Sequence, residues 1–199
     1  MRIAPRTALA LALAALVAVA ACDRSQAPAA AAPTPADPVR AEGPALPAQS
    51  IGGLAIEGEG LRIFDAAGAP RALPFETPQA TVIAAVAASV GGAAPEVITN
   101  SECGAGPVQF ARFANGLQLA FQDSKFAGWT LDQEGLSTVD GVEVGMSRAA
   151  LSANRTVEMQ EDSTLGAEFS AGDISGFFAS TAADSPVTSM YAGLTCFFR

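Results

Sequence analysis

A stretch rich in alanine and proline, residues 23–50, most narrowly limits where this chain can fold. Fifteen of its 28 residues are Ala or Pro, and it has no aromatic residue and no pattern of Ile or Leu beyond the single Leu46. Because so little apolar surface cannot offset the entropy of ordering the backbone, we expect an unfolded tether there. The sequence therefore predicts a single folded domain in residues 51–199, a length that suits one core.

The segment before the tether, residues 1–21, has the pattern of a signal peptide. Arg2 and Arg6 form a cationic head, and residues 8–21 run without charge. This apolar run suits a signal-peptide core and is shorter than the roughly 20 residues of a membrane-spanning helix. We therefore expect it to be removed from the mature protein.

The end of this leader, Val19-Ala20-Ala21-Cys22, resembles the lipobox of bacterial lipoproteins. The resemblance implies cleavage before Cys22, lipid attachment to its thiol and a periplasm-facing membrane anchor, so that residues 22–50 comprise the lipidated N-terminus and the tether. Asp23 resembles a signal for the inner membrane, with the outer membrane as the alternative. Ordinary secretion after Ala18-Val19-Ala20 is the other interpretation of this leader.

The charge of the domain narrows the choice of partners. Residues 51–199 carry seven Lys/Arg and seventeen Asp/Glu, a net charge of −10. Acidic protein repels phosphate backbones, and the chain has no basic cluster, so we expect no nucleic-acid partner.

The cysteines predict one disulfide. If Cys22 carries lipid, Cys103 and Cys196 remain as a pair in an oxidising compartment. Closing a loop of about 90 residues would stabilise the fold by about 3–5 kcal/mol in the chain-entropy model. Two separate buried thiols are the alternative. Two cysteines without any histidine also argue against a zinc site, and we expect no metal and no cofactor.

Apolar runs broken by Gly and polar turns predict short strands and two helices. Thr77-Pro78 offers a helix start, and Val82, Val86 and Val90 continue at helical spacing toward Gly91. A second, short helix is predicted over Arg148–Ala153. The expected strands are Leu54–Ile56, Leu61–Phe64, Ala72–Phe75, Val97–Thr99, Val108–Phe113, Leu117–Phe121, Phe126–Leu131, Thr156–Met159, Ala167–Ser170, Ile174–Ala179, Val187–Tyr191 and Thr195–Phe198.

This order predicts an α+β fold, with short helices packed on small antiparallel sheets. The finer interpretation is two tandem helix-plus-meander repeats, with halves 51–133 and 134–199. The matching landmarks are Phe110 with Phe169, Gly116 with Gly176, Leu119 with Ala179, and Trp129 with Tyr191.

The order of helix and meander, together with GVEVGMSRAAL at residues 141–151, resembles the tandem α+β repeats of the β-lactamase inhibitor protein and of small outer-membrane assembly lipoproteins. The resemblance implies a binding or structural module rather than an enzyme, and no functional residue is carried over from it.

Residues for catalysis are scarce. The chain has no histidine, which removes the commonest general base, and its only lysine is Lys125. Gly58-Glu59-Gly60 lacks the third glycine of a dinucleotide fingerprint. A dehydrogenase of the aspartate-semialdehyde type, which needs a histidine base and a free cysteine, therefore has no support in the sequence.

Acidic groups leave one catalytic alternative. The closest groupings are Asp132/Glu134, Asp140/Glu143 and Glu161/Asp162, which we interpret as solvated turns. Two carboxylates about 5 Å apart in a cleft would instead suit a retaining glycosidase.

Trp129 and Tyr191 are the chain's only Trp and Tyr. They suit core anchors and are also the candidates for contact with a ligand or partner. The sequence thus predicts an anchored envelope module that binds a protein or an envelope component. The alternatives are a histidine-free envelope hydrolase with paired carboxylates and a passive structural lipoprotein.

Overall fold

The computed structural model describes residues 53–197, so the leader, Cys22 and the Ala/Pro-rich tether lie outside the described residues. The described part contains two helices, α1 (Gln79–Val90) and α2 (Arg148–Asn154). Its strands are β1 (Leu54–Glu57), β2 (Gly60–Phe64), β3 (Pro70–Pro74), β4 (Val97–Asn100), β5 (Val108–Arg112), β6 (Leu117–Gln122), β7 (Lys125–Leu131), β8 (Glu158–Met159), β9 (Ala167–Ala171), β10 (Ile174–Phe178) and β11 (Val187–Gly193). Neither helix is long and apolar enough to cross a membrane.

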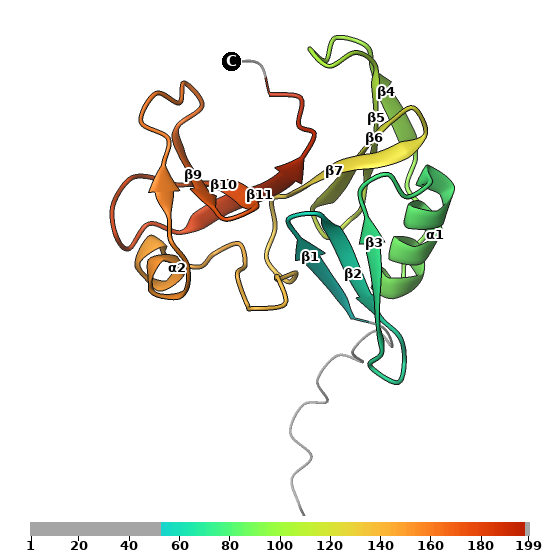
Figure 1. Cartoon of the computed structure of the whole chain (residues 1–199), viewed down its shortest axis with the longest axis horizontal. Helices are drawn as coiled ribbons and strands as arrows, with labels where there is room; N and C mark the ends of the chain where they lie inside the picture. Colours follow the sequence, from blue (N-terminus) through green and yellow to red (C-terminus); the bar gives the residue numbers. More distant parts are fainter. Residues whose placement is uncertain (1–52, 198–199) are drawn as a thin grey trace, which may run out of the picture. The chain divides into compact units, whose positions relative to one another are not determined.

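The strands form two antiparallel sheets (Figure 1). The smaller sheet has the order β1-β2-β3, and the larger has eight strands in the order β4-β5-β6-β7-β11-β10-β9-β8. Its two meanders meet where β7 pairs with β11, with Thr130 opposite Tyr191 and Trp129 opposite Ala192. The second meander therefore continues the first as one sheet.

The α+β prediction is wrong. Of the described residues, 42% lie in strands and only 13% in helices, so the fold is mostly β. We expected the two meanders to form separate small sheets, but they form one eight-stranded sheet. They join because β7 and β11 pair their backbone N–H and C=O groups, which would otherwise remain at two exposed sheet edges.

Two further details of the sequence prediction differ from the structure. Residues 195–197 are not a strand, although Thr195–Phe198 was expected to be one. Gly116 lies in the turn before β6, whereas Gly176, its expected counterpart, lies inside β10 opposite Met190. An added Cβ at Gly176 would come within 2.4 Å of the Ser189 carbonyl oxygen, so this glycine allows close packing rather than a turn.

Local sequence signals define both helices. Pro78 immediately precedes α1, and Gly91 ends it in a left-handed conformation with φ of 68°, while its N–H donates to the Ala87 carbonyl. In α2 the Ser147 side chain accepts a hydrogen bond from the Ala150 N–H, which satisfies one free donor of the first turn.

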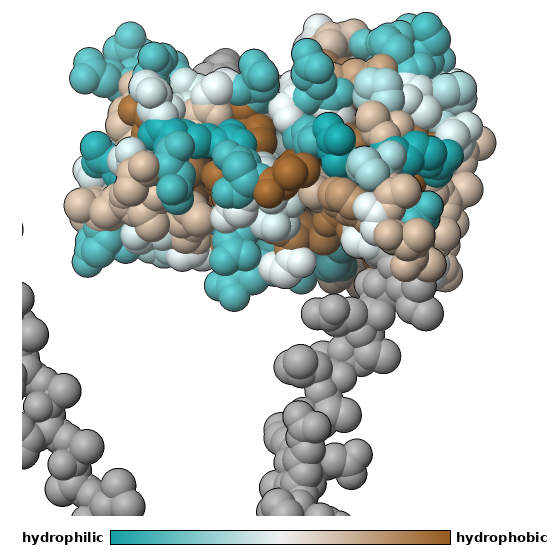
Figure 2. Space-filling view, turned by 60° about the horizontal axis from the view of Figure 1, so that its bottom comes forward, coloured by the Kyte–Doolittle hydropathy of each residue, from teal (hydrophilic) through white to brown (hydrophobic). Residues whose placement is uncertain are grey.

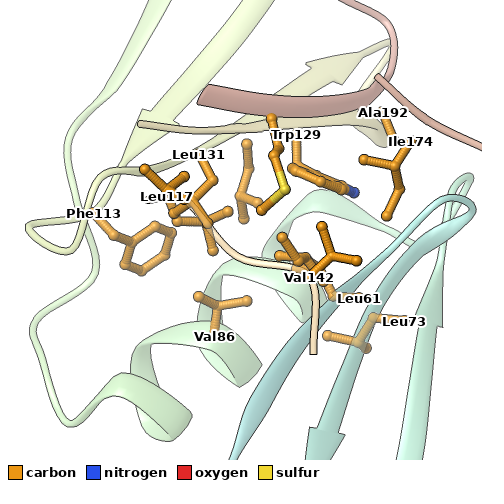
Figure 3. Close-up of a cluster of buried hydrophobic side chains, with 14 of the residues drawn as sticks. Leu61, Leu73, Val86, Phe113, Leu117, Trp129, Leu131, Val142, Ile174 and Ala192 are labelled. Atoms are coloured by element: carbon orange, nitrogen blue, oxygen red, sulfur yellow. The ribbon is translucent and has the colours of Figure 1, made fainter. Parts of the chain in front are cut away.

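The main core lies between the two sheets and the helices (Figure 3). Val82 and Val86 of α1 are fully buried there, as is Leu151 of α2. Trp129 on β7 is also fully buried, and its indole N–H donates to the Glu57 carbonyl oxygen of β1 at 2.8 Å. Trp129 therefore ties the eight-stranded sheet to the three-stranded one.

Candidate binding site

The face of the eight-stranded sheet that points away from this core, here called the outer face, carries a mixture of polar and aromatic side chains. The strand register aligns Arg112, Gln118, Thr130, Tyr191 and Ser175 across β5, β6, β7, β11 and β10. Residues directly opposite each other in paired strands point to the same face. Because Trp129, the neighbour of Thr130, points into the core, these five positions share the outer face.

A short segment after β11, residues 194–197, crosses the outer face and is called here the C-terminal strap. Its Leu194 N–H donates to the Ala127 carbonyl oxygen at 2.8 Å. Figure 1 shows it on the side of the sheet away from β1–β3, between β9–β10 and β4–β6.

A disulfide joins the strap to the loop between β4 and β5. Cys196 pairs with Cys103, with their Cα atoms 5.3 Å apart across a sequence separation of 93 residues. The predicted pairing of these two cysteines is confirmed. Cys103 packs with the buried Val108 and Ala120, and the strap's Leu194 covers this small second core. The disulfide and these apolar contacts hold the strap against β5 and β6.

Gly128 allows the strap to lie close to β7. A Cβ atom at this position would come within 2.3 Å of the Leu194 carbonyl oxygen, which is backbone. We expect Gly128→Val to lower the free energy of unfolding by about 1–3 kcal/mol through overpacking, measured by urea denaturation. Gly104→Val is the matched control, since nothing lies within 4 Å of an added Cβ there. Equal stability of the two variants would contradict this account of the strap.

A pocket of about 240 Å³ lies on the outer face beside the strap. Three aromatic rings form one wall: the ring centroids of Phe177 and Tyr191 are 5.8 Å apart, those of Phe177 and Phe197 are 5.7 Å apart, and those of Tyr191 and Phe197 are 5.0 Å apart. The other lining residues come from β5, β6, β7, β11, the strap and the position just after β7: Phe110, Gln118, Ala120, Thr130, Asp132, Ser189, Met190, Leu194, Thr195 and Cys196.

Tyr191 is held in place by a buried carboxyl group. Its hydroxyl donates to one oxygen of Glu168, and the Ser163 hydroxyl donates to the other oxygen at 2.5 Å. The Glu168 side chain is buried although it lies on the outer face, opposite Phe177 in the register. These hydrogen bonds fix the tilt of the Tyr191 ring and with it the shape of the aromatic wall.

Asp132 is the one charged residue that lines the pocket. One of its carboxylate oxygens lies 2.6 Å from Nη2 of Arg112, and both side chains are about half exposed. The pocket thus combines apolar walls with a rim of neutral polar groups and one solvated ion pair.

The two predicted ligand-contact residues have different positions. Tyr191 lines the pocket, whereas Trp129 lies on the opposite face of the sheet, inside the core, and contributes nothing to the pocket. Sequence reasoning did not name Phe110, Phe177 or Phe197 as ligand contacts. The adjacent pair Phe177-Phe178 held a usable signal, because neighbouring strand residues face opposite sides and one of the two must point away from the core.

All six residues of the acidic groupings are exposed, in agreement with solvated turns. Asp132 pairs with Arg112, and Asp140 pairs with Arg155 through two hydrogen bonds of 2.8 and 2.6 Å. Glu134 and Glu143, from different groupings, both line another pocket of about 420 Å³ near the start of α2. Within residues 53–197, no group of three or more His, Cys, Asp or Glu residues could hold a metal ion.

Because Asp140 is paired with Arg155, we expect the stability of the fold to depend on pH. Hydrogen bonds from Arg155, and secondarily from Thr138, hold the pKa of the Asp140 carboxyl well below its ordinary value of 3.8. Stabilisation by this ionised group is therefore present above about pH 4 and is lost as the pH falls toward the lowered pKa. We expect Asp140→Asn to be less stable than the wild type at pH 7, with the difference shrinking by pH 2.5, measured as urea midpoints.

Asp184→Asn is the control for this pH experiment, because Asp184 is exposed and belongs to none of the four ion pairs in residues 53–197. A stability difference between Asp140→Asn and the wild type that stays constant from pH 7 to pH 2.5 would refute the Arg155 contribution.

One other face of the domain has no large apolar patch. Figure 2 turns the lower side of Figure 1 toward the viewer, and there hydrophilic residues interrupt the apolar ones, so that strongly hydrophobic residues form only small areas. The aromatic pocket is therefore a better candidate for recognition than this face.

Comparison with known proteins gave no match: no family model, no curated protein and no solved structure is similar enough to this chain to place it.

Proposed function

We propose that this chain is a lipid-anchored protein of the cell envelope whose domain holds a protein or an envelope component on its outer face. One observation carries the proposal: the outer face has an aromatic pocket whose wall is built from β10, β11 and the strap. Aromatic side chains at a partly exposed pocket are typical of recognition sites, because they bury a large area at low entropic cost.

The sequence supports the location. The leader and the lipobox-like Val19-Ala20-Ala21-Cys22 suit an exported, anchored protein, and the tether of residues 22–50 would space the domain from the bilayer. A disulfide between Cys103 and Cys196 fits an oxidising compartment. Lipid on Cys22 predicts that Cys22→Ser moves the protein from the membrane fraction to the soluble fraction, and retention of this variant in membranes would contradict anchoring.

The binding role is tested by crosslinking in intact cells. A small aliphatic photoreactive amino acid, far less bulky than tryptophan and so able to leave the pocket open, replaces Ser189, which lines the pocket, or Ser152, which is exposed on α2. We expect a specific crosslinked species from position 189 and none from position 152, identified by pull-down and mass spectrometry. Equal labelling at both positions, or none at either, would favour the passive structural role.

The pocket lined by Glu134 and Glu143 favours a second candidate function, hydrolysis through paired carboxylates. This candidate predicts that the purified chain hydrolyses peptidoglycan or another envelope glycan, and that Glu134→Gln and Glu143→Gln each abolish this hydrolysis. Turnover that survives both substitutions would exclude these carboxylates as the catalytic pair.

A further inference from the structure

We propose that the outer-face pocket receives one large apolar side chain from a partner protein, and that basic residues flank this side chain in the partner's chain. The inference rests on the proposed binding function and names the chemistry of the partner. Three features of the site lead to it: its size, its charge and its rigidity.

The size of the pocket suits a side chain better than a free small molecule. Sites for drug-sized ligands enclose about 300–1,000 Å³, whereas this pocket encloses about 240 Å³. The rings of Phe177, Tyr191 and Phe197 line it and pack against one another, which favours an aromatic or large aliphatic guest. A single buried anchor of this kind supplies much of the affinity in many protein complexes.

Apart from the neutral Asp132–Arg112 pair, the charge around the pocket is negative and favours cations. No Lys or Arg lines the pocket, and Arg112, the cation aligned with Gln118 on the outer face, is already paired with Asp132. Glu158 of β8 is exposed and aligned with Ser170 on the same face, and residues 51–199 as a whole carry a net charge of −10. Such a field attracts a basic segment and repels an acidic one.

The rigidity of the pocket lowers the entropic cost of binding. The strap is held by the disulfide at Cys196 and by the Leu194 backbone hydrogen bond, and the Tyr191 ring is held by Glu168. A wall that is already ordered before binding loses little conformational freedom when a side chain enters it.

Selection from a random 12-residue peptide library on the immobilised full chain tests the proposal. We expect the enriched peptides to share an aromatic or large aliphatic residue flanked by Lys or Arg. Enrichment of acidic peptides, of peptides without an apolar anchor, or of none at all would overturn it.

Two pairs of variants test how the selected peptide binds, with fluorescence anisotropy of the labelled peptide as the measurement. Ser189→Trp fills the pocket and should weaken binding at least about 30-fold, whereas the matched Ser152→Trp on α2 should not change it. Glu158→Lys should weaken binding about 3–10-fold at low salt. The same charge reversal at the exposed Glu59, between β1 and β2, should have a smaller effect. If the two variants of either pair weakened peptide binding equally, the proposed binding of an apolar side chain with basic neighbours at this pocket would be overturned.

The crosslinking experiment separates this inference from the proposed function. A specific partner captured at position 189 through an acidic or purely polar segment would leave the binding function standing and refute the basic, apolar chemistry assigned here. Absence of any position-189 partner together with failure of the peptide selection would refute both.

Discussion

Replacing Trp129 with alanine is expected to lower the free energy of unfolding by about 3–5 kcal/mol, the usual cost of removing a large aromatic side chain from a packed core. Trp129 is fully buried on β7, and its indole N–H donates to the Glu57 carbonyl oxygen on β1. The substitution therefore removes packing between the two sheets and leaves a partly buried acceptor without this donor. Urea denaturation followed by circular dichroism measures the effect, since the variant has no tryptophan to report it.

Trp129→Phe separates the two contributions. It keeps an aromatic ring in the core but has no N–H for Glu57, so we expect a smaller loss of about 1–3 kcal/mol from the missing hydrogen bond and partial packing. Tyr191→Phe is the comparison on the opposite face. It also removes one side-chain hydrogen bond, the one to Glu168, but Tyr191 lines the pocket and is not part of the main core. A loss below about 1 kcal/mol for Trp129→Ala would show that the sheets do not depend on this side chain.

Removing the disulfide is the second change with a large expected effect. The double variant Cys103→Ser/Cys196→Ser opens a loop of 93 residues, and the chain-entropy model gives a loss of about 3–5 kcal/mol in the free energy of unfolding. The double variant is preferable to either single one, because neither cysteine is then left as a free thiol that could form wrong pairs.

Reductant provides the control for this prediction. We expect dithiothreitol to lower the urea midpoint of the wild type toward that of the double variant and to leave the double variant unchanged. Because Cys196 belongs to the strap that lines the pocket, the double variant should also weaken binding of the selected peptide. A wild type whose stability and peptide affinity are both insensitive to reductant would contradict a structural role for this bridge.

Most individual elements could be predicted from the sequence, because their signals are local. α1 begins after Pro78 and ends at Gly91, as expected from a proline near the first turn and a glycine after the last. The strands β5, β6 and β7 lie within a residue or two of their predicted bounds. The α+β class was wrong even though these strands were expected, because it gave two short helices too much weight. The single eight-stranded sheet could not be predicted, because the pairing of β7 with β11 joins residues about 60 positions apart in sequence.

The candidate site was predicted only in part. The Cys103–Cys196 pairing followed from counting cysteines, and Tyr191 was one of two aromatic candidates. Trp129 and Tyr191 looked equivalent in sequence, yet they lie on strands whose paired residues place them on opposite faces of one sheet. No local signal reports which face of a strand packs against a core made by distant segments.

The sequence alone determined the likeness of the leader to a lipoprotein signal, the negative charge, the pairing of the two remaining cysteines and the positions of most turns and strands. These properties depend on composition or on neighbouring residues. The tertiary structure decided that the two meanders form one sheet, that its outer face carries an aromatic pocket, and that the strap forms part of its wall. These depend on contacts between residues far apart in the chain, where packing and backbone pairing outweigh local preference.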